Sequence, residues 1–183
     1  MIIIKEKDCV YFASPLKYHN SCAQVDSDYN FEENGDMWHL NDGNGTVVAV
    51  KANNSRVLDV LRYSDAFSGE FSMEGMAQIR ENIKRVIRKS ECTPSDPAIS
   101  FCIARGTDGY VVSIAGSVFE INSIEVLGEK TERVLATYDV CKDIPDICER
   151  VATVYHKIEG GSDYKYLPVA LISTKDDSYT LLK

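Results

Sequence analysis

The sequence lacks the features that mark several common classes of protein. No apolar run among its 183 residues approaches the length that spans a membrane, and its first residues do not read as a secretory signal. Basic side chains are outnumbered 20 to 28, and the net charge of −8 makes nucleic acid or an anionic membrane a poor partner. Repeats and low-complexity tracts are also missing. We therefore expect neither a membrane protein nor a nucleic-acid-binding protein.

Paired cysteines and clustered histidines are missing as well. The six cysteines are scattered without any C-x-x-C, and the three histidines lie far apart in the sequence. This spacing predicts free, mostly buried thiols in a cytoplasmic protein that has no metal site and no cofactor. Asp26, Asp28 and Asn30 begin like an EF-hand loop, but Phe31 replaces the required glycine. A solvated acidic loop is the better interpretation of that stretch.

What the chain does have is enough apolar residues for one sizeable core. The hydrophobic fraction of 44% predicts a single folded domain over residues 1–183. The chain opens with two apolar runs, Ile2 to Ile4 and Cys9 to Ala13, separated by four charged residues. This pattern predicts a tight hairpin that begins at the first residue.

The remaining elements are predicted in blocks of strands and helices. A second hairpin is expected over 37–51, followed by a helix that starts near Ser55 and a longer helix capped by Ser72. Later strands are expected over 99–104, 110–115, 118–121 and 124–127, helices over 129–138 and 142–158, and a last hairpin over 169–172 and 179–182. Near-continuous apolar strands imply sheets that are buried on both faces. The order predicts an α+β fold, a four-layer α-β-β-α sandwich of two antiparallel sheets between helices.

Several motifs then resemble the proteasome β-subunit family, which includes the HslV-type peptidases and belongs to the N-terminal nucleophile (Ntn) hydrolases. The opening residues 1–4 and the run Val10 to Ser14 resemble the first hairpin of that family. The strand 47–50 followed by Asn53, Asn54 and Ser55 resembles its strand, small-residue turn and helix. Residues 109–112, Gly116 and the run 119–121 resemble its central strands.

The resemblance implies amide hydrolysis by an N-terminal threonine, supported by a lysine, an aspartate and a Gly-Ser-Gly turn that binds the oxyanion. In this chain the threonine's place falls on Met1 or Ile2, and neither side chain has a hydroxyl or thiol. The aspartate's place falls on Ser14 and the lysine's place on His39. The turn becomes Gly128-Glu129-Lys130, which keeps only its first glycine. Four changes at four positions argue against the family's reaction.

Three further sites in the sequence have a chemical and a plainer interpretation. His39 has the chemistry of a general base for Cys9 or Cys22, although a strand histidine is more often a packed residue. Gly45-Thr46 looks like an autoprocessing junction, but cleavage there would remove the strands before it, so an ordinary turn is favoured. Glu159, Ser162 and Asp163 fall where the family has an Asp-x-x-Ser motif, and a polar loop is the plainer interpretation.

The sequence therefore predicts a non-catalytic proteasome-like subunit, or a binding or assembly module. The alternative is an active peptidase or amidohydrolase that uses a processed terminus or a non-standard nucleophile. The resemblance implies a homo-oligomer, in the form of a ring, with other protein subunits or a peptide ligand as further partners. The basic face from Arg80 to Lys89 is a candidate docking surface for acidic patches on neighbouring copies.

Overall fold

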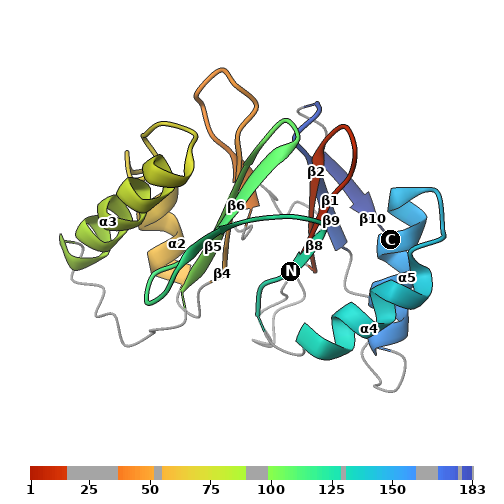
Figure 1. Ribbon diagram of the computed structural model, residues 1–183. Coiled ribbons are helices and arrows are strands. Elements are labelled where there is room, and N and C mark those ends of the chain that lie inside the picture. Colours follow the sequence, from red (N-terminus) through yellow and green to blue (C-terminus); the bar gives the residue numbers. More distant parts are fainter. Residues whose placement is uncertain are drawn as a thin grey trace, which may run out of the picture.

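The computed structural model describes residues 1–15, 37–51, 55–89, 99–128, 131–159, 169–176 and 179–182. Within these residues, ten strands form two five-stranded sheets, and helices cover the outer face of each sheet (Figure 1). This arrangement confirms the predicted four-layer sandwich. The sequence-based interpretations of residues 18–36, of the caps Asn53 and Asn54, of Glu129 and Lys130, and of Ser162 and Asp163 lie outside the described residues.

The first sheet contains the opening hairpin at its centre. Its strand order is β10-β9-β2-β1-β8, and every pair is antiparallel. The strands are β1 (Ile2–Lys5), β2 (Val10–Pro15), β8 (Ile124–Val126), β9 (Val169–Ser173) and β10 (Tyr179–Leu182). The predicted final hairpin is present, but only β9 lies inside the sheet and β10 forms its edge.

The second sheet follows the chain in order. Its strands run β3-β4-β5-β6-β7, so each strand pairs with the next one along the sequence. They are β3 (Met37–His39), β4 (Val47–Lys51), β5 (Ser100–Arg105), β6 (Asp108–Ser113) and β7 (Val118–Glu120). The chain then crosses directly from β7 into β8 of the first sheet, which joins the two sheets through a short connection.

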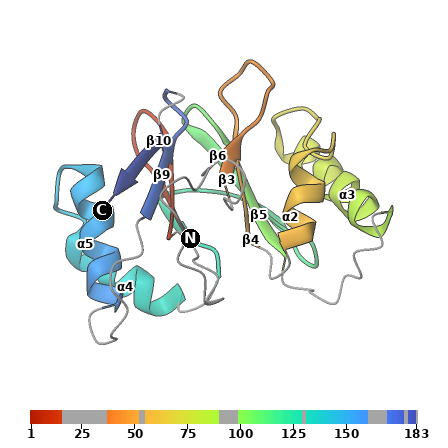
Figure 2. The same cartoon turned by 180° about the vertical axis from the view of Figure 1, so that it is seen from behind.

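Among the described residues, two helices cover each sheet, as Figures 1 and 2 show from opposite sides. The second sheet is covered by α2 (Ser55–Arg62) and α3 (Met73–Lys89), and the first sheet by α4 (Thr131–Cys141) and α5 (Ile147–Glu159). Ser72 caps α3 as predicted, because its Oγ accepts a hydrogen bond from the Gly75 amide at 3.1 Å. The prediction that the last helix begins at residue 142 was wrong. The helix starts at Ile147, because Asp146 accepts a hydrogen bond from the Glu149 amide and acts as the cap.

The described residues form three apolar cores, one in each space between the four layers. Alternate residues of each strand point to opposite faces of its sheet, so one strand contributes to two cores. Buried residues of α2 and α3 pack on the outer face of the second sheet. Residues of α4 and α5 pack on the outer face of the first sheet. A middle core lies between the sheets, formed by Met1, Ile3, Val10, Phe12, Met37, Val47, Ala49, Cys102, Ala104, Val111, Ile121, Leu127, Ala170 and Ile172.

The β1–β2, β3–β4 and β5–β6 turns and the residues that directly follow β9 gather at one end of the sandwich, which we call the hairpin end, and the first residue lies at the other (Figure 1). The side chain of Thr174 links the two sheets there. Its Oγ1 accepts a hydrogen bond from the Val10 amide at 2.9 Å and donates one to the Gly106 carbonyl. The residues that follow β9 are thereby fixed against both the β1–β2 hairpin and the β5–β6 turn.

A polar cluster around Asp42 lies in the β3–β4 turn at this same end. Asp42 Oδ2 accepts hydrogen bonds from Thr46 Oγ1 at 2.6 Å and from Arg105 Nη2 at 2.9 Å. Burial by itself would raise the pKa of the Asp42 carboxyl. Hydrogen bonds from Thr46 and Asn44, together with the charge of Arg105, outweigh burial and hold this pKa below its usual value.

Candidate functional site

Met1 lies in the middle core at the end of the sandwich opposite the hairpin turns. Its side chain is only 9% exposed. Its α-amino group donates a hydrogen bond to the Leu127 carbonyl at 3.1 Å, and the Leu127 amide donates one to the Met1 carbonyl at 3.0 Å. This reciprocal pair extends the ladder between β1 and β8, so the first residue is held as firmly as a central strand residue.

The alternation of β1 decides which of its first two residues faces the space between the sheets. Met1 and Ile3 belong to the middle core, whereas Ile2 and Ile4 pack toward α4 and α5. From the sequence, the threonine's place falls on either Met1 or Ile2. The structure turns Ile2 toward the helix layer, and Met1 is the first residue that faces the opposite sheet.

Ser14 and Gly128 both lie close to Met1. Ile2 pairs with Ala13 across β1 and β2, so Met1 and Ser14 are the next residues along the same ladder and share a face. Ser14 is 6% exposed and pairs with Ala170 of the middle core. Gly128 directly follows Leu127 and has a φ of 111°, a backbone conformation that favours glycine. Of the predicted site residues, the structure therefore brings Met1, Ser14 and Gly128 together, and Glu129 lies outside the described residues.

His39 lies toward the other end of the sandwich. It is the last residue of β3 and pairs with Val47, the first residue of β4, beside the turn at the hairpin end. Met37, two residues earlier on the same face of β3, lies farther from that end and is part of the middle core together with Met1. The register of β3 thus gives the position nearer Met1 to a methionine thioether, which neither accepts nor donates a proton in catalysis.

The alternative that His39 acts as a general base for Cys9 would require these two side chains to meet, although they belong to different sheets. The Cys9 thiol shares a hydrogen bond with the Tyr11 hydroxyl, and Tyr11 packs against the core under α4 and α5. This hydrogen bond, followed by burial and nearby negative charges, raises the pKa of Tyr11 above its usual value. Cys9, two residues before Tyr11, lies on that same helix-covered face of the first sheet, whereas His39 lies on the face of β3 that carries Met37 of the middle core. Cys22 lies outside the described residues.

Two titratable groups that the sequence did not single out lie at the middle core. Cys102 of β5 is buried there, and burial followed by the negative charge of Glu125 raises the pKa of its thiol well above the usual value. Glu125 of β8 pairs with Ile3 and shares its face, and burial raises the pKa of its carboxyl. A thiol kept protonated in this way is a poor nucleophile. A lone glutamate in the run Ile124-Glu125-Val126 gives no sequence signal that it faces the core.

Within the ranges that the structure describes, no group of three or more His, Cys, Asp or Glu side chains is arranged to hold a metal ion. Among the same residues, no helix combines the length and the apolar character needed to cross a membrane.

The sheet order, the flanking helix pairs and the strand that begins at Met1 define the class: this is the Ntn fold of the proteasome β-subunit type. Similar solved structures include the Thiobacillus denitrificans protein BPH, bound to epoxomicin in one structure and without it in another. Their TM-scores are 0.63, at 16% and 15% identity, covering 100% of this chain and 98% or 97% of theirs. Anbu (ancestral beta-subunit) from Yersinia bercovieri matches at a TM-score of 0.63 and 11% identity, covering 99% of this chain and 85% of Anbu. No protein-family model matches the sequence, and no curated protein matches it either.

Proposed function

We propose that this protein uses the proteasome β-type fold to bind or assemble, and that it does not hydrolyse peptides. The observation that carries the proposal is the composition of β1 on the face toward the second sheet. Met1 and Ile3 occupy that face, and neither has a hydroxyl or thiol that could attack a carbonyl. The Met1 side chain instead fills the middle core as an ordinary apolar residue.

The residues around Met1 support the same conclusion. Ser14, next to Met1, stands at the position that the resemblance assigns to an aspartate. Its side chain is a neutral hydroxyl, and the residue is buried. The histidine that stands for the lysine lies toward the hairpin end. A nucleophile needs a base within hydrogen-bond reach and a third group that orients the base. Of the described residues around Met1, Ser14 is a neutral hydroxyl, and the Cys102 thiol of the same core is buried with a raised pKa, which makes it a poor nucleophile. Together with Gly128, Glu125 and the apolar side chains, they do not supply this set.

As an assembly module, the chain would form one domain over residues 1–183 and associate with copies of itself, other subunits or a peptide. We place it in the cytoplasm, because Cys9, Cys102, Cys141 and Cys148 are all free thiols, as expected in a reducing compartment.

Epoxomicin provides the test, because it is the ligand in one of the BPH structures. The full chain is incubated with a molar excess of epoxomicin, and its intact mass is measured over several hours. We expect the mass to remain that of the unmodified protein, while BPH treated in parallel serves as the positive control. A stoichiometric adduct would overturn the proposal. Peptide mapping of that adduct, together with a Ser14→Ala variant, would identify the nucleophile that had been missed.

A further inference from the structure

Helix α3 and the segment 131–149 on the other side of the sandwich carry opposite net charge. Five basic and two acidic side chains lie on α3, whereas residues 131–149, which cover α4 and the start of α5, hold five acidic and two basic ones. Figures 1 and 2 show α3 and α4 on opposite sides of the molecule, separated by both sheets. Each molecule therefore presents a basic surface on one side and an acidic surface on the other.

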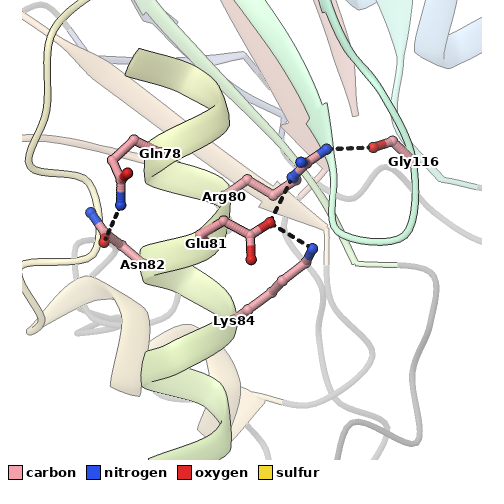
Figure 3. A network of polar contacts seen from close by, with 6 residues as sticks. All are labelled: Gln78, Arg80, Glu81, Asn82, Lys84 and Gly116. Carbon is pink, nitrogen blue, oxygen red and sulfur yellow. Dashed lines mark hydrogen bonds and ion pairs between the residues drawn. The ribbon is translucent and has the colours of Figure 1, made fainter. Parts of the chain in front are cut away.

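Part of the charge on α3 is used inside the molecule, as Figure 3 shows. Arg80 Nη1 donates a hydrogen bond to the Gly116 carbonyl at 2.7 Å, which fixes α3 to the β6–β7 turn. Glu81 Oε1 lies 3.2 Å from Arg80 Nε and 2.8 Å from Lys84 Nζ. The charged side chains in the middle of α3, Arg80, Glu81 and Lys84, therefore have partners within the same molecule.

The last turns of α3 carry a further group of cations. Arg85, Arg88 and Lys89 are exposed, and the last two follow Arg85 by three and four residues, so they share one side of the helix. Arg85 donates a hydrogen bond to the neutral side chain of Asn82 at 2.9 Å. We call these three residues the α3 basic end.

The outer face of α4 combines apolar and acidic side chains. Glu132, Leu135, Ala136, Asp139 and Val140 are all exposed, and their spacing of three and four residues places them on one stripe. Val140 is 72% exposed, although α4 also buries apolar residues on its inner face. A helix that is apolar on both sides is typical of an element with a second packing partner. We call these five residues the α4 outer stripe.

We propose that a second copy of this chain docks its α3 basic end on the α4 outer stripe. The stripe extends over nine residues, about 12 Å of helix, and Arg85 and Lys89 are about 6 Å apart before their long side chains are counted. Arginine and lysine stems cover apolar surface while their charged ends remain solvated or paired. The stems would cover Leu135 and Val140, and the cations would reach Glu132 and Asp139. Asp139 already forms an ion pair with Lys142 of its own chain, at 2.8 Å between Oδ1 and Nζ. Both side chains are exposed, and such a pair is weak enough for another cation to replace Lys142.

The contact joins two different surfaces of the chain, so it is heterologous. Such contacts build closed rings when the rotation between copies closes, and open filaments when it does not. The inference rests on the proposed assembly role, because it names the surfaces through which copies of the chain would meet.

Charge reversal on each surface tests the contact. Arg85→Glu/Arg88→Glu makes both surfaces acidic, and Glu132→Lys/Asp139→Lys makes both basic. Sedimentation velocity at several protein concentrations in low salt should show self-association of the unchanged chain. We expect each double variant to weaken that self-association at least ten-fold, and high salt to weaken it for the unchanged chain. An equimolar mixture of the two variants should associate again, because each then offers the complement that the other lacks.

Lys157→Glu/Lys175→Glu serves as the control, because it changes the net charge by the same amount as the α3 variant at exposed positions outside both surfaces. Circular dichroism confirms that every variant is folded. The proposal is overturned if the unchanged chain stays monomeric in low salt, if the control weakens association as much as the α3 variant, or if the mixture does not associate. An epoxomicin adduct would count against the proposed function and not against this contact, so the two failures are distinguishable.

Discussion

Arg150 connects the helix layer of the first sheet to the β1–β2 hairpin, and replacing it would measure how strongly that connection stabilises the fold. The residue is 7% exposed. Its Nη1 lies 2.6 Å from Glu6 Oε1 and donates to the Tyr138 hydroxyl at 3.1 Å, while its Nε donates to the Ile144 carbonyl at 2.8 Å. One guanidinium thus joins α4, the residues before α5 and the opening hairpin.

The expected magnitude follows from the exposure of the two charges. Removing one partner of a fully buried pair costs about 3–5 kcal/mol of unfolding free energy. The Glu6 side chain is 38% exposed and regains solvent when Arg150 is lost, which reduces that cost. Arg150→Met keeps most of the aliphatic volume but removes the hydrogen bonds, so we expect it to lower the unfolding free energy by about 2–3 kcal/mol. For a domain of this size, this corresponds to a fall in Tm of about 5–10 °C.

Urea unfolding followed by circular dichroism checks this value. Arg150→Lys retains the charge but loses the planar guanidinium. Its unfolding free energy should lie between those of the unchanged chain and Arg150→Met. Lys157→Met is the matched control on the exposed side of the same helix, and we expect it to remain within 0.5 kcal/mol of the unchanged chain, roughly the range of surface substitutions. If Arg150→Met proves as stable as that control, the cluster does not stabilise the contact between the layers and the reasoning fails.

Three further predictions concern a glycine, a carboxylate and a thiol. A Cβ added at Gly75 would lie 1.9 Å from the Glu70 carbonyl oxygen, so Gly75→Ala should lower the urea midpoint far more than Gly43→Ala, where φ is 69° and nothing lies within 4 Å. The pKa of Asp42 is depressed in the folded state, so its stabilising effect is complete above the usual aspartate pKa near 4 and is lost as the pH falls through the folded value. The stability difference between the unchanged chain and Asp42→Asn should therefore be larger at pH 7 than at pH 3. The buried Cys102 thiol should resist iodoacetamide in the native protein and react in urea, as peptide mass mapping would show, and labelling of Cys102 in the native protein would contradict its raised pKa.

Local patterns of the sequence predicted most elements correctly. In α3, isoleucines at four-residue spacing lie on the buried face, and Ser72 caps the helix as expected. The strands around Val47, Phe101 and Val112 were found because their apolar runs are long enough for sheets that are buried on both faces. The start of α5 was placed too early, because an amphipathic pattern does not show whether Asp146 or an earlier residue caps the helix.

The sequence by itself determined that neither of the first two residues is a threonine, and that the chain alternates blocks of strands and helices suited to a layered sandwich. The tertiary structure decided what each strand face meets. Periodicity shows that Met1 and Ile2 point in opposite directions, but only the packing of the layers shows which of them faces the second sheet. Likewise, the register that brings Ser14 beside Met1 and leaves His39 toward the hairpin end depends on how β1 pairs with β2 and how β3 pairs with β4 across their turns. A single strand carries no signal of that register, because it is set by the partner strand and the turns.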